Sequence, residues 1–251
     1  MTKSDYKILW GEGFKQIIKT LNSTEYPALG TVSQIVELKN KAFYSSDKEF
    51  KCFWWNQGFD TSDALVYSKE GILVVKDSLK TPLFSENSEM SYSNLKNSLN
   101  EGGMRLTPEQ YSSLEGRMIS GKELEKYKTC RLDQDLMSSE IILQDPVWDY
   151  LFQGNRDLLR EHIHYLFKGE KQKNVMRFIP GSYLANGPLL KLIHIKGKTS
   201  DLSGMYGLDE DRGRFVAISD EVVKREALIE ELRLKRAREF LEHNLEPTGQ
   251  C

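Results

Sequence analysis

The sequence predicts an α+β protein with a mainly antiparallel sheet built from hairpins, packed with helices and followed by a long C-terminal helix. Short runs rich in β-branched residues stand next to helical runs, without the regular strand–helix alternation of a parallel sheet. Turn residues separate pairs of these short runs. The last apolar-periodic stretch, 220–243, is much longer than the others.

Three stretches in the first third of the chain carry structural signals. Apolar positions in 5–21 recur at helical spacing and predict a helix. The aromatic-rich stretch 50–59 is expected to be extended. Residues 64–77 predict a β-hairpin, because two β-rich runs flank Ser68–Gly71 and Gly71 accepts the positive φ of a turn.

Helix starts are marked by capping signals further along. Thr107 is followed by Pro108 and by Gln110, which completes a capping box. Asp145 stands before Pro146 in the same way, and a helix is also expected to start at Ser120. Each of these positions predicts the beginning of a helix.

The region after Gly169 returns to a β pattern. Residues 175–196 predict two strands around the turn at Asn186–Gly187, with Pro188 favouring an edge position. Residues 213–218 predict a third strand, after which Ser219 caps the C-terminal helix.

Length and composition favour one domain, or two lobes. The chain has 251 residues, 39% hydrophobic and 29% charged, which is ordinary for a globular protein. The segment 85–104 is rich in Ser, Asn and Glu. We expect it to join the two lobes, 1–84 and 105–251, if the domain is divided.

Charge and cysteine content favour a cytoplasmic protein that does not enter a membrane. The net charge is −2, and no stretch approaches the roughly 18 apolar residues of a membrane span. The N-terminus lacks the apolar run of a signal peptide. The three cysteines, Cys52, Cys130 and Cys251, are far apart, as expected for reduced thiols.

His162 and His164 form a His-x-His pair within 156–167. Apolar residues in this stretch follow a helical stripe that includes His162. Because one residue turns a helix by about 100°, His164 faces away from His162. The pair therefore cannot share a metal ion. We expect His162 to be a hydrogen-bonded core residue and His164 to be a solvated one.

A basic segment between Arg160 and Ser200 is the strongest charge asymmetry in the chain. It holds eight basic and two acidic residues in a protein of net charge −2. Such a surface favours nucleic acid or another polyanion as partner. The candidate anion-binding residues are Arg177, Lys191, Lys196 and Lys198.

The loop 197–215 offers the main alternative, a divalent metal site. It lacks the order of a phosphate-binding loop and the spacing of an EF-hand. Its carboxylates, with a histidine just before them, predict a metal-dependent hydrolase, such as a phosphodiesterase or nuclease. The candidate ligands are His194, Asp201, Asp209 and Asp211. Apart from this metal no cofactor is predicted.

Two further features bear on function. Cys130, beside Lys128 and Arg131, is the candidate nucleophile of a thiol enzyme. The helix 220–243 has apolar residues on two sides, which favours self-association or a protein partner. Because catalytic motifs are missing, the preferred hypothesis is a non-catalytic binding protein with an anionic partner.

Overall fold

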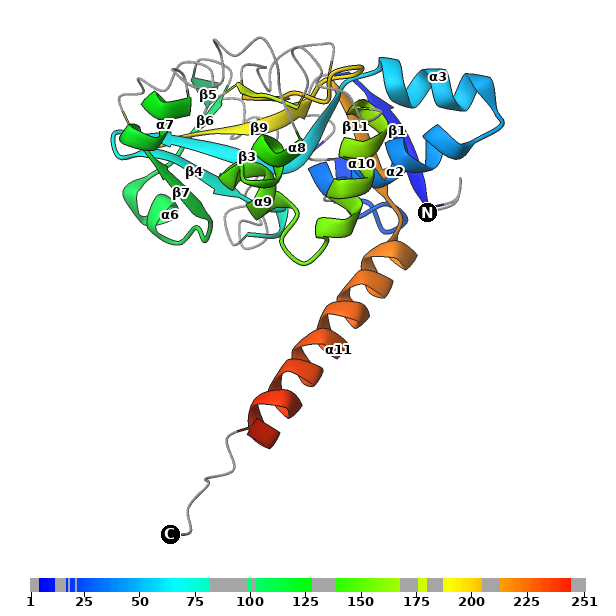
Figure 1. The fold of residues 1–251 in the computed structure, drawn as a ribbon. Coiled ribbons are helices and arrows are strands. Elements are labelled where there is room, and N and C mark those ends of the chain that lie inside the picture. Colours follow the sequence, from blue (N-terminus) through cyan, green and yellow to red (C-terminus); the bar gives the residue numbers. More distant parts are fainter. Residues whose placement is uncertain are drawn as a thin grey trace.

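The computed structural model describes residues 5–11, 17, 19–20, 22–81, 99–100, 103–127, 139–167, 176–179, 187–204 and 213–244. These residues form a sheet with helices packed on it and a long helix, α11, that extends away from the rest (Figure 1). The strands are β1 (Tyr6–Trp10), β2 (Ala28–Leu29), β3 (Phe59–Ser68), β4 (Gly71–Val75), β5 (Leu99–Asn100), β6 (Gly103–Arg105), β7 (Arg117–Ser120), β8 (Phe178–Ile179), β9 (Leu189–Ile195), β10 (Leu202–Ser203) and β11 (Arg214–Ile218). The helices are α2 (Val32–Tyr44), α3 (Lys48–Asn56), the 3-10 turn η1 (Ser78–Lys80), α6 (Pro108–Ser112), α7 (Gly121–Tyr127), α8 (Ser139–Leu143), α9 (Pro146–Leu151), α10 (Arg156–Phe167) and α11 (Asp220–Asn244).

The prediction of helices combined with a sheet is confirmed, but the sheet is mixed. Its central order is β1-β11-β3-β9-β10-β8. β3 pairs with β11 in parallel, and so does β10 with β8. Strands from either side of the segment 85–104 share this sheet, because β9 pairs with both β3 and β6.

Two cores lie on opposite faces of the sheet. Strand alternation along β9 sends Ile193 and Ile195 to the face covered by α2 and α10, and sends Leu190 and Leu192 to the other face. On the helical face α10 packs against α2 (Figure 1). None of the helices in the described ranges is both long and apolar enough to cross a bilayer.

Local capping signals predicted helix starts well. Thr107 and Gln110 form the expected capping box at α6, and Asp145 accepts hydrogen bonds from the first backbone N–H groups of α9. The helix predicted for 156–167 is α10. The antiparallel pairing expected within 64–77 is that of β3 with β4, joined by two residues.

The aromatic stretch 50–59 is not extended as expected. Most of it forms α3, because Asp47 caps the helix by accepting hydrogen bonds from the N–H groups of Glu49 and Phe50. Trp54 is buried and stacks on Phe59. Phe50, Phe53 and Trp55 are half-buried and pack against the same core.

Two other sequence-based expectations were wrong, the first of them in part. In the stretch 5–21, predicted to be a helix, residues 6–10 form β1, which pairs along its whole length with β11. Residues 17, 19 and 20, described further along this stretch, are helical as predicted. β8 and β9 do not pair as a hairpin around Gly187. Instead β10 lies between them, and β9 is a central strand with partners on both sides, not an edge strand. Both outcomes depend on strands distant in sequence, which local patterns do not encode.

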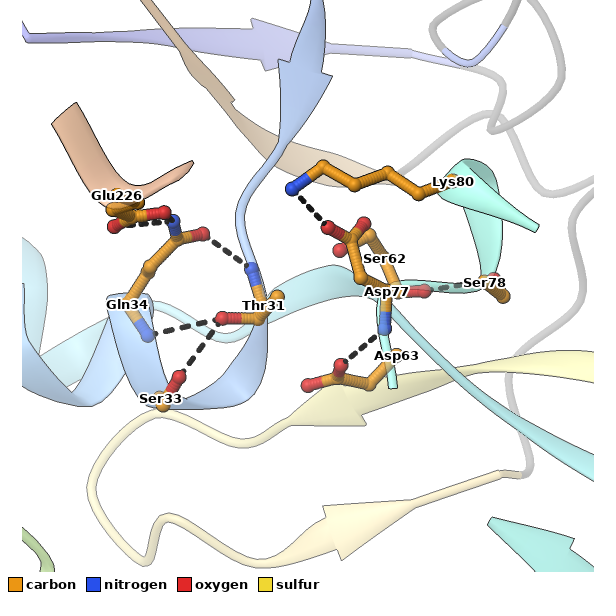
Figure 2. Close-up of polar contacts among 9 residues, drawn as sticks. All are labelled: Thr31, Ser33, Gln34, Ser62, Asp63, Asp77, Ser78, Lys80 and Glu226. Carbon is orange, nitrogen blue, oxygen red and sulfur yellow. Dashed lines mark hydrogen bonds and ion pairs between the residues drawn. The ribbon is translucent and has the colours of Figure 1, made fainter. Parts of the chain in front are cut away.

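A buried carboxylate, Asp63, joins the sheet to the start of α2 and to Asp77 before η1. Figure 2 shows the contact of Asp63 with Asp77. The pairing of β3 with β9 shifts register between Asp60 and Ala64, which frees Asp63 from the ladder. One oxygen of Asp63 accepts a hydrogen bond from the Val32 N–H at 2.7 Å, and the other accepts from the Asp77 N–H at 2.9 Å. Ser78 Oγ also donates to the carbonyl of Ser62 at 2.7 Å.

The same region anchors the start of α11. Gln34, the capping-box residue of α2, donates to both carboxylate oxygens of Glu226 at 2.9 and 2.8 Å (Figure 2). Val222 is fully buried, and the Asp220 N–H donates to the carbonyl of Glu25. These contacts hold only the first turns of α11 against the rest of the protein.

Replacing Asp63 with Asn should alter the pH dependence of stability. Burial raises the pKa of Asp63 from 3.8 to about 6, against the lowering effect of the two backbone N–H groups. A raised folded-state pKa contributes stability that is present below pH 3.8 and is lost as pH rises through 6. Between pH 5 and 8 the Asp63 term should therefore cost the wild type about 1–2 kcal/mol, and this loss should be absent from Asp63→Asn.

Urea unfolding at several pH values measures this difference. Asp157→Asn is the matched control, because the side chain of Asp157 is 95% exposed. Equal pH slopes in wild type and Asp63→Asn would contradict the raised pKa of the buried carboxyl.

Candidate functional site

The turn between β9 and β10, residues 196–201, lies at the centre of the residues singled out from the sequence. The Lys196 N–H donates to the carbonyl of Asp201 at 2.8 Å, and the Ser200 N–H donates to that of Gly197 at 3.3 Å. From outside the turn, the Met176 N–H donates to the carbonyl of Thr199 at 2.8 Å. We call residues 196–201 the β9–β10 turn.

A fully buried lysine is hydrogen-bonded to the backbone of the β9–β10 turn. Lys39, on α2, donates hydrogen bonds from Nζ to the carbonyls of Trp54 and Gly197, each at 3.0 Å. Its ammonium group also lies 5.8 Å from the centre of the Trp55 ring. Burial lowers the pKa of Lys39 from 10.5 to about 7, because the charged form loses its hydration.

His162, on α10, holds the other end of the turn. Its Nδ1 lies 2.7 Å from Asn40 Oδ1 and its Nε2 lies 3.0 Å from Ser200 Oγ. The amide nitrogen of Asn40 donates elsewhere, to the carbonyl of Leu158 and to Glu161, so Asn40 Oδ1 accepts. His162 therefore donates from Nδ1 and accepts the Ser200 hydroxyl at Nε2, as a neutral imidazole.

The environment of His162 keeps it uncharged. Burial lowers its pKa from 6.5 to about 3, and the nearby Lys39 charge adds to the effect. The ring also stacks on Trp55, with 5.7 Å between ring centres. This confirms the prediction of a hydrogen-bonded core histidine. His164, by contrast, is exposed, so the two imidazoles do not converge on one ion.

Ser200, His162 and Asn40 form a hydrogen-bonded chain with the order of nucleophile, base and orienting group. Their exposed fractions are 0, 0 and 3%, and a histidine with a pKa near 3 is a poor base at neutral pH. Ser200 also takes a left-handed conformation, with φ of 50°. We interpret these hydrogen bonds as structural contacts that fix the conformation of the turn, because Ser200 is inaccessible to solvent.

The carboxylate of Asp201, a predicted metal ligand, accepts hydrogen bonds from Arg177 and Thr199. One carboxylate oxygen accepts the Arg177 N–H at 2.8 Å, and the other accepts from Thr199 Oγ1 at 3.0 Å and from the Arg177 guanidinium at 3.3 Å. The side chain is 1% exposed. Asp201 and Arg177, placed in separate hypotheses by the sequence, thus form one ion pair.

His194 pairs instead with an acid that the sequence analysis did not single out. Its Nδ1 lies 2.9 Å from Asp60 Oδ1, and the other oxygen of Asp60 accepts the Arg214 N–H at 3.1 Å. Gly58 allows the ring to lie there, because a Cβ at that position would come 2.4 Å from Nε2. The pair follows from the register of β3 with β9, which puts Asp60 opposite His194.

The described residues hold no group of three or more His, Cys, Asp or Glu side chains able to bind a metal. Asp209 and Asp211, the remaining predicted ligands, lie outside the described residues, as does Cys130. The metal site and the thiol nucleophile therefore stay predictions.

The four predicted anion-binding residues are not all on one surface. Lys191 lies between Leu189 and Ile193 in β9 and so shares their face, opposite to that of His194. The Arg177 guanidinium is occupied by Asp201. Lys196 is half-buried and Lys198 is exposed, and these two lysines share the β9–β10 turn.

A second surface, on α11, is apolar. Leu228, Ile229, Leu232 and Leu234 are exposed by 56, 44, 47 and 52%. Leu228, Ile229 and Leu232 lie on one side of the helix, whereas Leu234, two residues after Leu232, faces the other side. We call Leu228, Ile229 and Leu232 the α11 surface. Figure 1 shows the helix leaving the rest of the protein after its first turns.

Comparisons with known proteins identify the fold. No protein-family model and no curated protein matches the chain. A solved structure described as "Accommodation of massive sequence variation in Nanoarchaeota by the C-type lectin fold" matches with a TM-score of 0.53 and 14% identity, over 86% of this chain and 99% of that one. The protein thus has a C-type lectin-like fold. Identity this low shows the fold alone.

Replacing His162 with Gln should weaken the acid sensitivity of the fold. A depressed folded-state pKa contributes stability that is present above pH 6.5 and is lost as pH falls toward 3. At pH 4 the His162 term should cost the wild type about 3 kcal/mol. His162→Gln should be less stable at pH 7, because two hydrogen bonds change, but should lose less on acidification.

Chemical unfolding between pH 7 and 4 provides the measurement. His164→Gln is the control, since it removes an exposed histidine from the same helix. If both variants kept the acid sensitivity of the wild type, His162 would not be the buried neutral base described above.

Proposed function

We propose that this protein is a non-catalytic interaction protein, in which the C-type lectin-like body carries α11 as an arm that contacts another protein chain. The observation that carries the proposal is the α11 surface, with three large apolar side chains about half-exposed within five residues. Single exposed apolar residues are ordinary, whereas a cluster on a projecting element is typical of interaction sites.

The attachment of α11 supports this role. Its first turns are fixed by Val222 and by the hydrogen bonds of Gln34 to Glu226. Beyond them, the described side chains at 227–229, 231–232 and 234–236 are exposed. An arm that is anchored at one end and apolar along its middle is suited to packing against another helix.

The interior of the body supports a binding role as well. Ser200, His162 and Lys39 are of residue types found in catalytic sites, but all three are buried. His162 is hydrogen-bonded to Ser200, and Lys39 donates to the carbonyl of Gly197 in the same turn. They stabilise the position of a surface turn. A scaffold of this kind presents loops in fixed positions, which favours recognition. A cytoplasmic location remains part of the proposal.

A polyanion such as nucleic acid is the second proposed partner, and the β9–β10 turn is its contact. Lys198 is exposed there and Lys196 lies beside it, while Lys39 and His162 hold the backbone in place. A fixed turn loses little conformational entropy on binding. Hydrolysis assisted by a divalent metal, with Asp209 and Asp211 joining His194, stays the alternative prediction.

The variant Lys196→Glu/Lys198→Glu should bind heparin more weakly than the wild type. Loss of two cationic contacts should also lower the salt dependence of binding, by about two in the slope of log K against log salt. Heparin affinity measured at several salt concentrations gives both quantities. Lys122→Glu/Lys224→Glu is the matched control, because it changes the net charge equally at two exposed lysines elsewhere. Equal weakening by both double variants would count against the turn.

The variant Leu228→Gln/Leu232→Gln should leave the stability of the body unchanged within about 0.5 kcal/mol, because these side chains are about half-exposed and belong to neither core of the described residues. Glutamine has nearly the helix propensity of leucine, so the helix is kept. Val222→Ala, at a buried position of the same helix, should cost about 2 kcal/mol.

Thermal or urea unfolding at low protein concentration tests this contrast. If Leu228→Gln/Leu232→Gln destabilised the protein as much as Val222→Ala, α11 would pack on its own body, and the proposed arm would be wrong.

A further inference from the structure

We infer that a cavity between β7 and the connection of α9 to α10 binds a small organic anion, in which a phosphate or carboxylate group is attached to a ring. The cavity encloses about 450 Å³, within the roughly 300–1,000 Å³ of small-molecule sites. It belongs to the body and involves neither the α11 surface nor the β9–β10 turn, so this binding is separate from the proposed function. The lining includes Arg117, Pro146, Asp149, Tyr150, Gly154 and Arg156.

The walls of the cavity are fixed by the core beneath them. Trp148 in α9 is fully buried, and its indole N–H donates to the carbonyl of Met176 at 2.8 Å. In the connection to α10 the Asn155 N–H donates to the carbonyl of Phe152 at 2.8 Å, and Gly154 takes a positive φ of 86°. On the other side, β7 pairs with β4. Fixed walls reduce the conformational entropy lost on binding.

Arg117, on β7, has an ion pair that a ligand can replace at little cost. Its Nη2 lies 3.2 Å from Glu123 Oε1, and the two side chains are 48 and 41% exposed. The other oxygen of Glu123 accepts from the N–H and the hydroxyl of Ser120 at 2.8 and 2.9 Å. These two bonds lower the pKa of Glu123 more than the charge of Arg117 does. Glu123 therefore keeps its main partners when Arg117 turns to an anion.

Arg156, at the start of α10, is oriented by Asp149 and retains part of its binding capacity. Both Nε and Nη2 donate to the same oxygen, Asp149 Oδ1. Nη1 takes no part in this contact, and a planar guanidinium with a fixed orientation is suited to binding an oxyanion. The lining thus combines two guanidinium groups with one carboxylate, which leaves it net positive.

Tyr150 explains why the anion should carry a ring. It is half-buried, and its ring lines the cavity together with Pro146, so both offer apolar contact. Burial raises the pKa of Tyr150, and the charges of Asp63 and Glu115 add to the effect. The phenol therefore stays protonated at neutral pH, as a donor to an oxyanion must. The Lys76 ammonium, 5.0 Å from the centre of the ring, opposes these two negative charges.

Titration of the full-length chain with phenyl phosphate, followed by the NMR signals of its backbone amides, tests the site. Saturable shifts should centre on Gly154 and its neighbours. Arg117→Gln and Arg156→Gln should each weaken binding about tenfold or more, because each removes charge-assisted hydrogen bonds. Arg160→Gln is the matched control. Its guanidinium is 60% exposed and ion-paired on the same helix, but it is not part of the lining, so affinity should not change.

Three further probes test the chemistry of the ligand. Benzoate replaces phosphate by carboxylate, and the tighter of the two aromatic anions identifies the preferred group. Benzyl alcohol, which has no charge, should not bind, and inorganic phosphate should bind more weakly than phenyl phosphate. Binding of benzyl alcohol as tight as that of the anions would overturn the role of the guanidinium groups. Inorganic phosphate binding as tightly as phenyl phosphate would overturn the role of the ring.

The variants also separate this cavity from other cationic surfaces. Lys196→Glu/Lys198→Glu should keep the affinity for phenyl phosphate, and its loss there would assign the binding to the β9–β10 turn instead. Equal weakening by Arg160→Gln, or a titration that does not saturate, would overturn the cavity as a site. The amide spectrum of each variant without probe checks that the fold is kept. None of these results affects the proposed arm, whose failure is marked by destabilisation in Leu228→Gln/Leu232→Gln.

Discussion

Two basic side chains inside the protein, Lys39 and His162, set the constraint on which its central architecture depends. Each can be buried only if its hydrogen-bonding groups are satisfied, and each finds partners on elements far apart in the chain. Lys39 joins α2 to the end of α3 and to Gly197, and His162 joins α10 to α2 and to Ser200. Three helices and the β9–β10 turn are therefore fixed relative to one another by polar contacts within an apolar interior.

This arrangement gives the buried histidine a structural role although its neighbours resemble a catalytic chain. A base must be able to take up a proton near neutral pH and to reach a substrate. His162 is uncharged to well below neutral pH and is closed off, so its hydrogen bonds serve to position Ser200. Similar reasoning applies to Asp201, whose oxygens are occupied by Arg177 and Thr199. The hydrogen-bonding groups of these residues are therefore occupied by contacts that stabilise the fold.

The body and the arm of the protein follow different physical rules. In the body, apolar side chains of the sheet are covered on both faces, and the buried side chains of Lys39, Asp63 and Asp201 are hydrogen-bonded or ion-paired. On α11 the large apolar side chains described beyond the first turns, which are Leu228, Ile229, Leu232 and Leu234, are about half-exposed. A helix in this state gains more from packing against a partner than from its own propensity. The C-type lectin-like fold accounts for the body, and the arm is the part on which the proposed function depends.

The sequence by itself determined the features that depend on neighbouring residues. These are the helix starts at Thr107 and Asp145, the pairing around Gly71, the helix that carries His162 and His164, and the long helix at the end of the chain. All of them arise from capping hydrogen bonds, turn geometry or helical periodicity, which act over a few residues.

Only the tertiary structure decided the rest. β1 is a strand because β11 lies beside it, and β10 separates β8 from β9 because sheet order is set by partners far away in sequence. The His194–Asp60 pair and the Arg177–Asp201 pair likewise follow from sheet register and chain crossing. Spacing along one sequence contains no information on such contacts, because they join residues whose separation along the chain is unrelated to their separation in space.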